Sequence, residues 1–240
     1  MNIVITMAGS GTRFLRAGYN QPKYTIKAKG KTLFEWSLLS LTGYNSLPNL
    51  NYIFIVQAKD SAIPFITEKI RQFRIKQYQI IEIDQPTDGQ ATSALLAEKY
   101  WHPDQELIIY NIDTYIEPNT LKYSDVQGDG FIPCFKAPGN HWSFVKLDDN
   151  GKVTEIKEKQ RISDNCTIGL YYFKSCQLYQ SLYREYYGTN NLHGQKEKFI
   201  APLYNLMVAK NLDVRINLIP SKKVHVLGTP EELNAFINAQ

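Results

Sequence analysis

Short apolar strands alternate with helical stretches over the first 111 residues, and this alternation is what most restricts the fold. The strand candidates are residues 2–7, 51–57, 78–84 and 106–111. They are rich in β-branched residues, which is typical of strands buried on both faces. The helix candidates between them are residues 32–42, 60–74 and 90–101, with Thr32, Asp60 and Asp88 as N-terminal caps. Strand–helix–strand units of this kind indicate a parallel sheet with right-handed crossovers.

The second half of the chain has a different rhythm. Its strand candidates are residues 130–136, 141–148, 152–159, 165–173 and 213–219. The residues Asp-Asp-Asn-Gly at 148–151 predict a hairpin turn between two of them. Helices are expected at 175–187, 197–210 and 229–239, and a polar, mobile loop at 188–196. With no repeat and no linker, we expect one α/β domain over 1–240, a Rossmann-like mixed, mostly parallel sheet flanked by helices.

Composition narrows the class of partner. The formal net charge of the 240 residues is +4, and the basic residues are dispersed, so we expect no nucleic-acid partner. No run approaches the roughly 20 apolar residues of a membrane helix, and Met1 enters a strand directly rather than a signal peptide. Three cysteines without zinc-type spacing favour a reduced, cytoplasmic protein.

A glycine loop with two cationic residues follows the first strand. Gly9 and Gly11 lack a Cβ, so the backbone can turn tightly and bring its N–H groups against a bulky anion. Arg13 and Lys23 add positive charge beside them. The P-loop and dinucleotide patterns do not match, because no Gly-Lys-Ser/Thr follows and no third glycine or alanine has the required spacing. The segment predicts a polyphosphate site of another type.

Two further strands end in polar groups. Gln85 and Gly89 follow the third strand, and Asn111 and Asp113 follow the fourth. Ligands bind at the carboxyl ends of parallel strands, so these residues are expected to converge with the glycine loop. Taken singly, the first pair also fits an ordinary turn, and Asp113 also fits a cap.

The pattern Gly9-x-Gly11-Thr-Arg13-Phe followed by Pro-Lys23 resembles the signature of the nucleotidyltransferases that make nucleoside-diphosphate sugars and related activated alcohols. The resemblance implies a GT-A-like fold, with a nucleotide half of about 1–115 and an acceptor half of about 116–240. It places Arg13 on the leaving phosphates, Lys23 on the α-phosphate and Mg²⁺ on Asp113. The nucleotide-binding residues that it implies are Ala8, Gly9, Ser10, Gly11, Thr12, Gln85 and Gly89.

The resemblance extends into the second half. Glu158 and Lys159 match the Glu-Lys pair that binds the acceptor and its phosphate in this family, although an exposed charged strand would look the same. Gly169 and Tyr171 match a Gly-[Ile/Leu]-Tyr strand lining the acceptor pocket, although a core strand is equally compatible. The remaining acceptor candidates are Asn111 and Trp142.

Two departures from the family pattern concern the metal and the acceptor. Val226 stands where many relatives have a second metal-binding Asp. Its neighbour His225 is one possible substitute, but imidazole is a poor Mg²⁺ ligand. Trp142-Ser143-Phe144 stands where sugar-1-phosphate enzymes commonly have an aromatic-Gly pair, so the acceptor site is expected to differ in shape.

The patterns W-S-[FY]-x-K-x-D from residue 142 and G-[IL]-Y-Y from residue 169 are similar to a group of short bacterial nucleotidyltransferases of capsule and surface-polysaccharide synthesis. The implied substrates are a nucleoside triphosphate, with a pyrimidine favoured, and a small phosphorylated acceptor such as a sugar phosphate. A CTP-dependent enzyme for phosphocholine, glycerol phosphate or phosphoglutamine remains an alternative. A glycosyltransferase and a non-catalytic nucleotide sensor are more remote, and the oligomeric state is not predicted.

Overall fold

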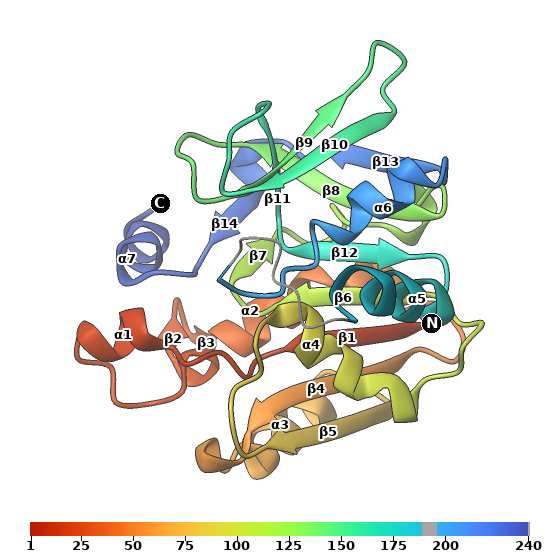
Figure 1. Ribbon diagram of the computed structural model, residues 1–240. Coiled ribbons are helices and arrows are strands. Elements are labelled where there is room, and N and C mark those ends of the chain that lie inside the picture. The colour runs from red at the N-terminus through yellow and green to blue at the C-terminus, as the bar shows by residue number, and fades with distance from the viewer. Residues whose placement is uncertain (189–195, 240) are drawn as a thin grey trace.

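A 10-stranded mixed sheet forms the centre of the molecule in the computed structural model, which describes residues 1–188 and 196–239 (Figure 1). Its strands are β1 (Asn2–Thr6), β4 (Asn51–Gln57), β5 (Gln77–Ile83), β6 (Leu107–Asn111), β8 (Gly130–Lys136), β9 (Ser143–Leu147), β10 (Val153–Glu158), β11 (Asn165–Thr167), β12 (Leu170–Phe173) and β13 (Val214–Leu218). The order across the sheet is β10-β9-β11-β8-β12-β6-β1-β4-β5, and β13 pairs with β8. The loop expected at 188–196 lies mostly outside the described residues.

The sheet changes character at β6. β1 pairs in parallel with both β4 and β6, and β4 pairs in parallel with β5. Beyond β6 the pairings of β12, β8, β11, β9 and β10 are antiparallel, and only β13 runs parallel to its partner. Two small antiparallel pairs lie apart from it, β2 (Lys27–Ala28) with β3 (Lys31–Thr32) and β7 (Thr114–Ile116) with β14 (Val224–Val226). The predicted mixed α/β fold is confirmed.

Helices cover both faces of the sheet (Figure 1). They are α1 (Thr12–Arg16), α2 (Leu33–Ser40), α3 (Ile63–Gln72), α4 (Gln90–Leu95), α5 (Cys176–Tyr187), α6 (Leu203–Ala209) and α7 (Pro230–Asn238). Successive strand residues point to opposite faces, so Ile3 and Ile5 pack with α2 and α3, whereas Val4 packs with α4 and α5. Both faces are apolar, which explains the continuous β-branched runs in the sequence.

Several expected boundaries are wrong. Asp60 and Asp88 are not helix caps, because α3 begins after Ala62 and α4 begins after Gly89. α4 ends at Leu95 and continues only as a 3₁₀ turn, and the helix expected at 197–210 spans Leu203–Ala209 alone. The strand expected at 165–173 is broken between β11 and β12, where Gly169 has a φ of 80° that no strand residue adopts.

The cap expected at Thr32 is confirmed. Its side chain accepts a hydrogen bond from the Glu35 N–H at 3.3 Å, and the Glu35 carboxylate accepts one from the Thr32 N–H at 2.8 Å. This reciprocal capping box satisfies two N–H groups that the first turn of α2 leaves without helical partners.

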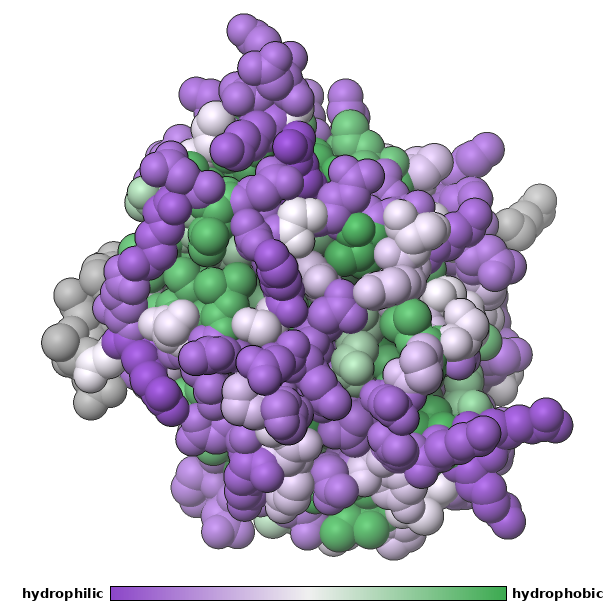
Figure 2. Space-filling view, turned by 90° about the vertical axis from the view of Figure 1, so that its right-hand side faces the viewer, coloured by the Kyte–Doolittle hydropathy of each residue, from purple (hydrophilic) through white to green (hydrophobic). Residues whose placement is uncertain are grey.

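The surface is largely polar. In the face shown in Figure 2, hydrophobic residues appear as small areas separated by hydrophilic ones. The large apolar side chains that are exposed, such as Leu15, Leu218 and Ile237, come from separate elements. Within residues 1–188 and 196–239, no helix has the length and hydropathy needed to cross a membrane.

Candidate active site

The carboxyl ends of β1, β4 and β6 border a pocket of about 800 Å³. Because these strands are parallel, loops that are far apart in the sequence meet at one edge of the sheet. The wall combines the glycine loop, the loop after β5, the turn after β6 and a segment that precedes α6. It includes residues 6–11, 20–24, 86–90, 111–113, 196–197 and 199.

The glycine loop lines this pocket. Gly11 has a φ of 62°, in the left-handed region that favours glycine, and α1 starts from it. The buried Gln57 amide donates hydrogen bonds to the carbonyl oxygens of Ala8 and Gly9 at 2.9 and 3.1 Å. Across a trans peptide the next N–H points the opposite way, so the N–H groups of Gly9 and Ser10 point away from Gln57. Neither N–H has a hydrogen-bond partner within the described residues.

Lys23 and Asp113 form an ion pair in the pocket wall. Lys23 begins a short 3₁₀ turn after Pro22, and Asp113 follows β6. The Asp113 carbonyl accepts a hydrogen bond from the Leu227 N–H at 2.7 Å, which ties this turn to the strand β14 region. The two side chains are 18% and 35% exposed, so both remain accessible to a ligand. The predicted phosphate-binding lysine and the predicted metal-binding carboxylate therefore meet.

Three predicted nucleotide-binding residues lie outside the wall. Thr12 and Arg13 are exposed on α1, and Gln85 is exposed in the loop after β5. Arg13 lies near Glu231 of α7. The pKa of Glu231 is lowered by its own backbone N–H, by Thr229 and also by the Arg13 guanidinium. Arg13 thus lies on the α7 side of the glycine loop.

Gly89 is held against another chain segment. It has a φ of 150°, and a Cβ added to it would lie 2.3 Å from the carbonyl oxygen of Lys198 and 2.5 Å from its nitrogen. A side chain at this position is therefore incompatible with the observed backbone. The surrounding residues 86–90 line the pocket, so the structure places this loop at the candidate site.

Gln57 and Gln90 are pocket residues that the motifs do not reveal. Gln90 donates a hydrogen bond from Nε2 to Thr6 Oγ1 at 3.1 Å and so ties the start of α4 to the end of β1. Gln57 is the last residue of β4. The rule that polar residues at carboxyl strand ends face the ligand, which selected Asp113, also selects Gln57.

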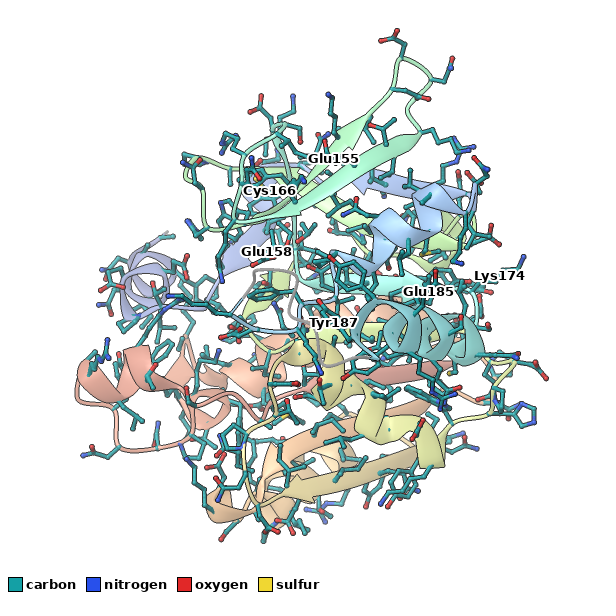
Figure 3. The ribbon with its side chains drawn as sticks, viewed as in Figure 1. Glu155, Glu158, Cys166, Lys174, Glu185 and Tyr187 are labelled. Carbon is teal, nitrogen blue, oxygen red and sulfur yellow. The ribbon has the colours of Figure 1, made fainter. Side chains whose placement is uncertain are left out.

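A second cluster of polar side chains, here called the polar group around Glu158, is formed by residues of β9 to β12. Its members are Ser143, Glu158, Thr167 and Tyr171. Glu158 accepts a hydrogen bond from Ser143, and its side chain is 11% exposed. The Tyr171 hydroxyl lies 3.4 Å from Ser143 Oγ and 3.2 Å from Thr167 Oγ1. Burial, together with the Glu158 charge, raises the pKa of Tyr171 to about 12, so the phenol stays protonated. Figure 3 shows Glu158 nearer than Glu155 of the same strand to the part of the molecule formed by residues 1–115.

Lys159 connects this polar group to the pocket. Its N–H donates a hydrogen bond to the Trp142 carbonyl at 2.8 Å, and its Nζ lies 3.5 Å from Glu158 Oε1. The same Nζ lies 4.5 Å from the ring centroid of Phe199, which lines the pocket. The predicted acceptor-binding pair is therefore next to this pocket.

The Trp142 side chain is directed elsewhere. Its indole N–H donates a hydrogen bond to the Pro138 carbonyl at 2.9 Å. The ring packs against His141 and Phe135, with centroid distances of 4.2 and 5.2 Å. Trp142 is not part of the pocket wall.

Gly169 makes room for Asn111. A Cβ on Gly169 would lie 2.1 Å from Asn111 Nδ2, and the Asn111 N–H donates a hydrogen bond to the Gly169 carbonyl at 3.1 Å. Asn111 lines the pocket, and its buried Oδ1 has no partner among the described residues. The two acceptor candidates Gly169 and Asn111 therefore contact each other at the end of β6.

The C-terminal segment places a second carboxylate beside Asp113. Neither Val226, which stands at the position of the missing Asp, nor its neighbour His225 takes this place. Val226 pairs with Thr114 in the β14–β7 ladder, and His225 lies 3.5 Å from a carboxylate oxygen of Glu117. His225 also stacks on Tyr115 at 5.2 Å between ring centroids. His225 is therefore engaged away from Asp113.

Glu232 supplies this second carboxylate. The position of a Cβ on Gly228 lies 3.3 Å from Glu232 Oε2 and 3.6 Å from Asp113 Oδ2, so both oxygens border one small space. Thr229 caps α7 by accepting a hydrogen bond from the Glu232 N–H at 3.2 Å. Among the described residues, however, the Glu232 carboxylate does not complete a capping box as Glu35 does in α2. Its Oε1 lies 3.8 Å from His141 Nε2, and its Oε2 borders the space beside Asp113.

Comparison with solved structures identifies proteins that are similar to this chain. The nucleoside-diphosphate-sugar pyrophosphorylase from Vibrio cholerae RC9 has a TM-score of 0.89 and 35% sequence identity, over 99% of this chain and 100% of that chain. The inositol-1-phosphate CTP transferase from T. maritima has a TM-score of 0.77 and 14% identity, over 98% and 93% of the two chains. A protein assigned as a glucose-1-phosphate thymidylyltransferase from Bacillus anthracis, solved with sucrose, has a TM-score of 0.80 and 13% identity, over 99% and 94%. The last two share the fold alone. No family model and no curated protein sequence matches the chain.

Proposed function

This chain belongs to the sugar-phosphate nucleotidyltransferase family, and we propose that it transfers a nucleoside monophosphate from a nucleoside triphosphate to a phosphorylated acceptor. The simplest acceptor is a sugar phosphate, and the second product is pyrophosphate. The proposal rests chiefly on the Lys23–Asp113 ion pair beside the unpartnered N–H groups of the glycine loop. N–H donors and an ammonium group at one pocket wall match the charge of a triphosphate.

The acceptor phosphate attacks the α-phosphorus, and the bond to the bridging oxygen of the leaving pyrophosphate breaks. No covalent enzyme intermediate is required, because the nucleophile is already an anion. The residues therefore act by positioning two mutually repelling anions and by neutralising charge in the transition state. Lys23 is assigned to the α-phosphate. The N–H groups of residues 8–11, which line the pocket, are assigned to the β- and γ-phosphates. Arg13 lies outside the pocket wall, so the phosphate-binding role that the family resemblance implies for it is not part of this proposal.

Asp113 and Glu232 would hold Mg²⁺ together. Their carboxylate oxygens are hard ligands of the kind that this ion prefers, and both border the space beside Gly228. Among the described residues no three His, Cys, Asp or Glu side chains form a metal cluster, so phosphate oxygens and water would complete the coordination. When bound, Mg²⁺ supplies charge neutralisation to the triphosphate. Glu232 would then replace the Asp that is absent at Val226.

The acceptor is assigned to the polar group around Glu158. Ser143 fixes this largely buried carboxylate, which leaves it able to accept hydrogen bonds from acceptor hydroxyl or amide groups. Lys159 lies beside it and is assigned to the acceptor phosphate. Because Lys159 also contacts Phe199 of the nucleotide pocket, the two phosphates would meet at this boundary.

A pyrimidine nucleotide and a role in surface-polysaccharide precursor synthesis in the cytoplasm complete the proposal. The resemblance of the Trp142–Asp148 segment to capsule enzymes supports the role. The loop 86–90, which lines the pocket and includes the Gln90 amide, supports the base. The T. maritima protein is named as an inositol-1-phosphate CTP transferase, and inositol phosphate is not a sugar phosphate. Non-sugar acceptors therefore belong in the test.

The test is pyrophosphate release with Mg²⁺. CTP, UTP, dTTP, ATP and GTP are crossed with sugar phosphates, inositol phosphate, phosphocholine, glycerol phosphates and phosphoglutamine. Release that depends on one nucleotide–acceptor pair is the expected result and identifies both substrates. Nucleotide binding without release from any pair would contradict the proposed transfer to these acceptors and favour a nucleotide sensor.

A further inference from the structure

Lys198 is a buried lysine outside the pocket wall. Its side chain is 4% exposed, although the residues on either side of it, Glu197 and Phe199, line the pocket. A charged group is buried at this level only when it is paired. Its position between two wall residues therefore calls for a physical explanation.

The Lys198 side chain is paired with the nucleotide loop. Its Nζ lies 2.8 Å from Asp88 Oδ2 and 5.7 Å from the ring centroids of Tyr183 and Tyr187. Burial lowers the pKa of Lys198, but the hydrogen bond to Asp88 and the nearby Tyr183 outweigh it, and the pKa is raised. Thr92 donates a hydrogen bond to Asp88 and contacts the Tyr183 hydroxyl at 2.7 Å. The ammonium is held in its charged form within one polar network.

The backbone of Lys198 pairs with the same loop. Its N–H donates a hydrogen bond to the Asp88 carbonyl at 2.8 Å, and its carbonyl accepts one from the Ala91 N–H at 3.0 Å. Gly89 lies between these two bonds without room for a Cβ. Side chain and backbone therefore fix residue 198 on the loop from which α4 begins.

This contact joins walls contributed by the two halves of the chain. Residues 86–90 belong to the nucleotide half, whereas Phe199 belongs to the acceptor half and supports the Lys159 ammonium. The Asp88 carboxylate, which also lines the pocket, would repel a triphosphate if Lys198 did not neutralise it.

We propose that Lys198 is a positioning residue that couples the two substrate sites, because it holds the acceptor-side wall at Phe199 on the nucleotide loop at Asp88. Nucleotide and acceptor then stabilise the same contact, and each is expected to bind more tightly in the presence of the other. This inference rests on the proposed function, but it concerns a residue that need not touch either reacting group.

The test compares Lys198→Met with Lys198→Arg and with the control Lys210→Met. Lys210 forms an exposed pair with Glu185 at 2.9 Å and is not part of the pocket wall. Initial rates are measured with both substrates varied, and binding of CTP, UTP, dTTP, ATP and GTP is measured by calorimetry without acceptor. We expect Lys198→Met to raise both KM values at least about tenfold and to abolish their mutual dependence, with a smaller change in kcat. The Arg variant is expected to recover most of the loss.

Two outcomes are kept apart. If the wild-type protein binds none of CTP, UTP, dTTP, ATP and GTP, the proposed function fails. If it binds a nucleotide and Lys198→Met keeps wild-type KM values and coupling, the role of Lys198 is overturned. Should Lys198→Met not fold, Asp88→Ala removes the same contact from its more exposed partner, and unchanged KM values in that variant would equally overturn the inference.

Discussion

The nucleotide half and the acceptor half position their polar groups by different means. In the nucleotide half, Gln57 and Asp113 lie at or just after the ends of parallel strands, so chain direction alone brings them to one edge. In the acceptor half, Glu158 meets Ser143 because the two residues are directly opposite in the antiparallel β10–β9 register. The first arrangement depends on backbone topology, and the second depends on strand register and side-chain hydrogen bonds.

This difference has a functional consequence. The glycine loop offers backbone N–H groups that no substitution other than proline removes, with Lys23 as its main side-chain contribution. The acceptor half offers almost only side chains. We therefore expect a single substitution in the nucleotide half to lower kcat. A single substitution in the acceptor half should instead raise the KM for the acceptor.

Lys23→Ala is expected to have the largest effect. Lys23 would act where charge develops on the α-phosphate, so kcat should fall by about 10²–10³ with little change in the nucleotide KM. Steady-state kinetics with the matching substrate pair measure this. Lys27→Ala, an exposed lysine outside the wall, is the control. A rise in KM alone would assign Lys23 to ground-state binding.

Glu158→Gln is expected to affect the acceptor side alone. The amide keeps one acceptor oxygen but loses the charge, so the acceptor KM should rise by about tenfold or more while nucleotide binding stays unchanged. Glu155→Gln, on the same strand but paired with Lys157 at 3.2 Å, should behave as wild type. Equal weakening of nucleotide binding by Glu158→Gln would remove the distinction between the halves.

Glu232→Gln tests whether the C-terminal segment of the acceptor half contributes to the nucleotide site. If Glu232 shares Mg²⁺ with Asp113, the Mg²⁺ concentration that supports half-maximal nucleotide binding should rise about tenfold. Glu231 is the neighbouring residue and is exposed, so Glu231→Gln should leave this Mg²⁺ concentration unchanged. Superimposed titrations for Glu232→Gln and wild type would exclude Glu232 as a ligand.

Thr32→Ala is expected to change stability rather than activity. Loss of the α2 capping box should cost about 1 kcal/mol in the free energy of unfolding, measured by denaturant titration. Thr229→Ala, at the incomplete cap of α7 in the other half, should cost no more.

The stability difference caused by Thr32→Ala should depend on pH. Burial raises the pKa of Glu35, but hydrogen bonds from Thr32 and the charge of Lys69 outweigh it and leave the pKa lowered. A lowered pKa stabilises the fold above the unfolded-state value of about 4.3 and loses that contribution as pH falls through the folded-state value. The difference in the free energy of unfolding between wild type and Thr32→Ala should therefore become smaller below about pH 4. A gap that is constant with pH would show that Glu35 does not contribute through its charge.

Much of the nucleotide half could be predicted from the sequence, because strand ends and glycine loops are local signals. Asp113, Lys23 and the loop around Gly89 all reach the pocket. Arg13, Thr12 and Gln85 do not, because they lie exposed outside the wall, which residue spacing does not encode. The acceptor half was harder to predict. The contacts of Glu232 with the Asp113 space and of Lys198 with Asp88 join residues more than 100 positions apart, and no local pattern predicts them.

The most direct measurement follows the oxygen atoms of the acceptor phosphate. With the substrate pair identified by pyrophosphate release, the acceptor is supplied with heavy oxygen in its phosphate, and the products are analysed by mass spectrometry. Attack of that phosphate on the α-phosphorus predicts that all the label stays in the nucleotide-linked product and that pyrophosphate is unlabelled. Label in the released pyrophosphate, or pyrophosphate formed without a nucleotide-linked product, would contradict nucleotidyl transfer at the Lys23–Asp113 pocket.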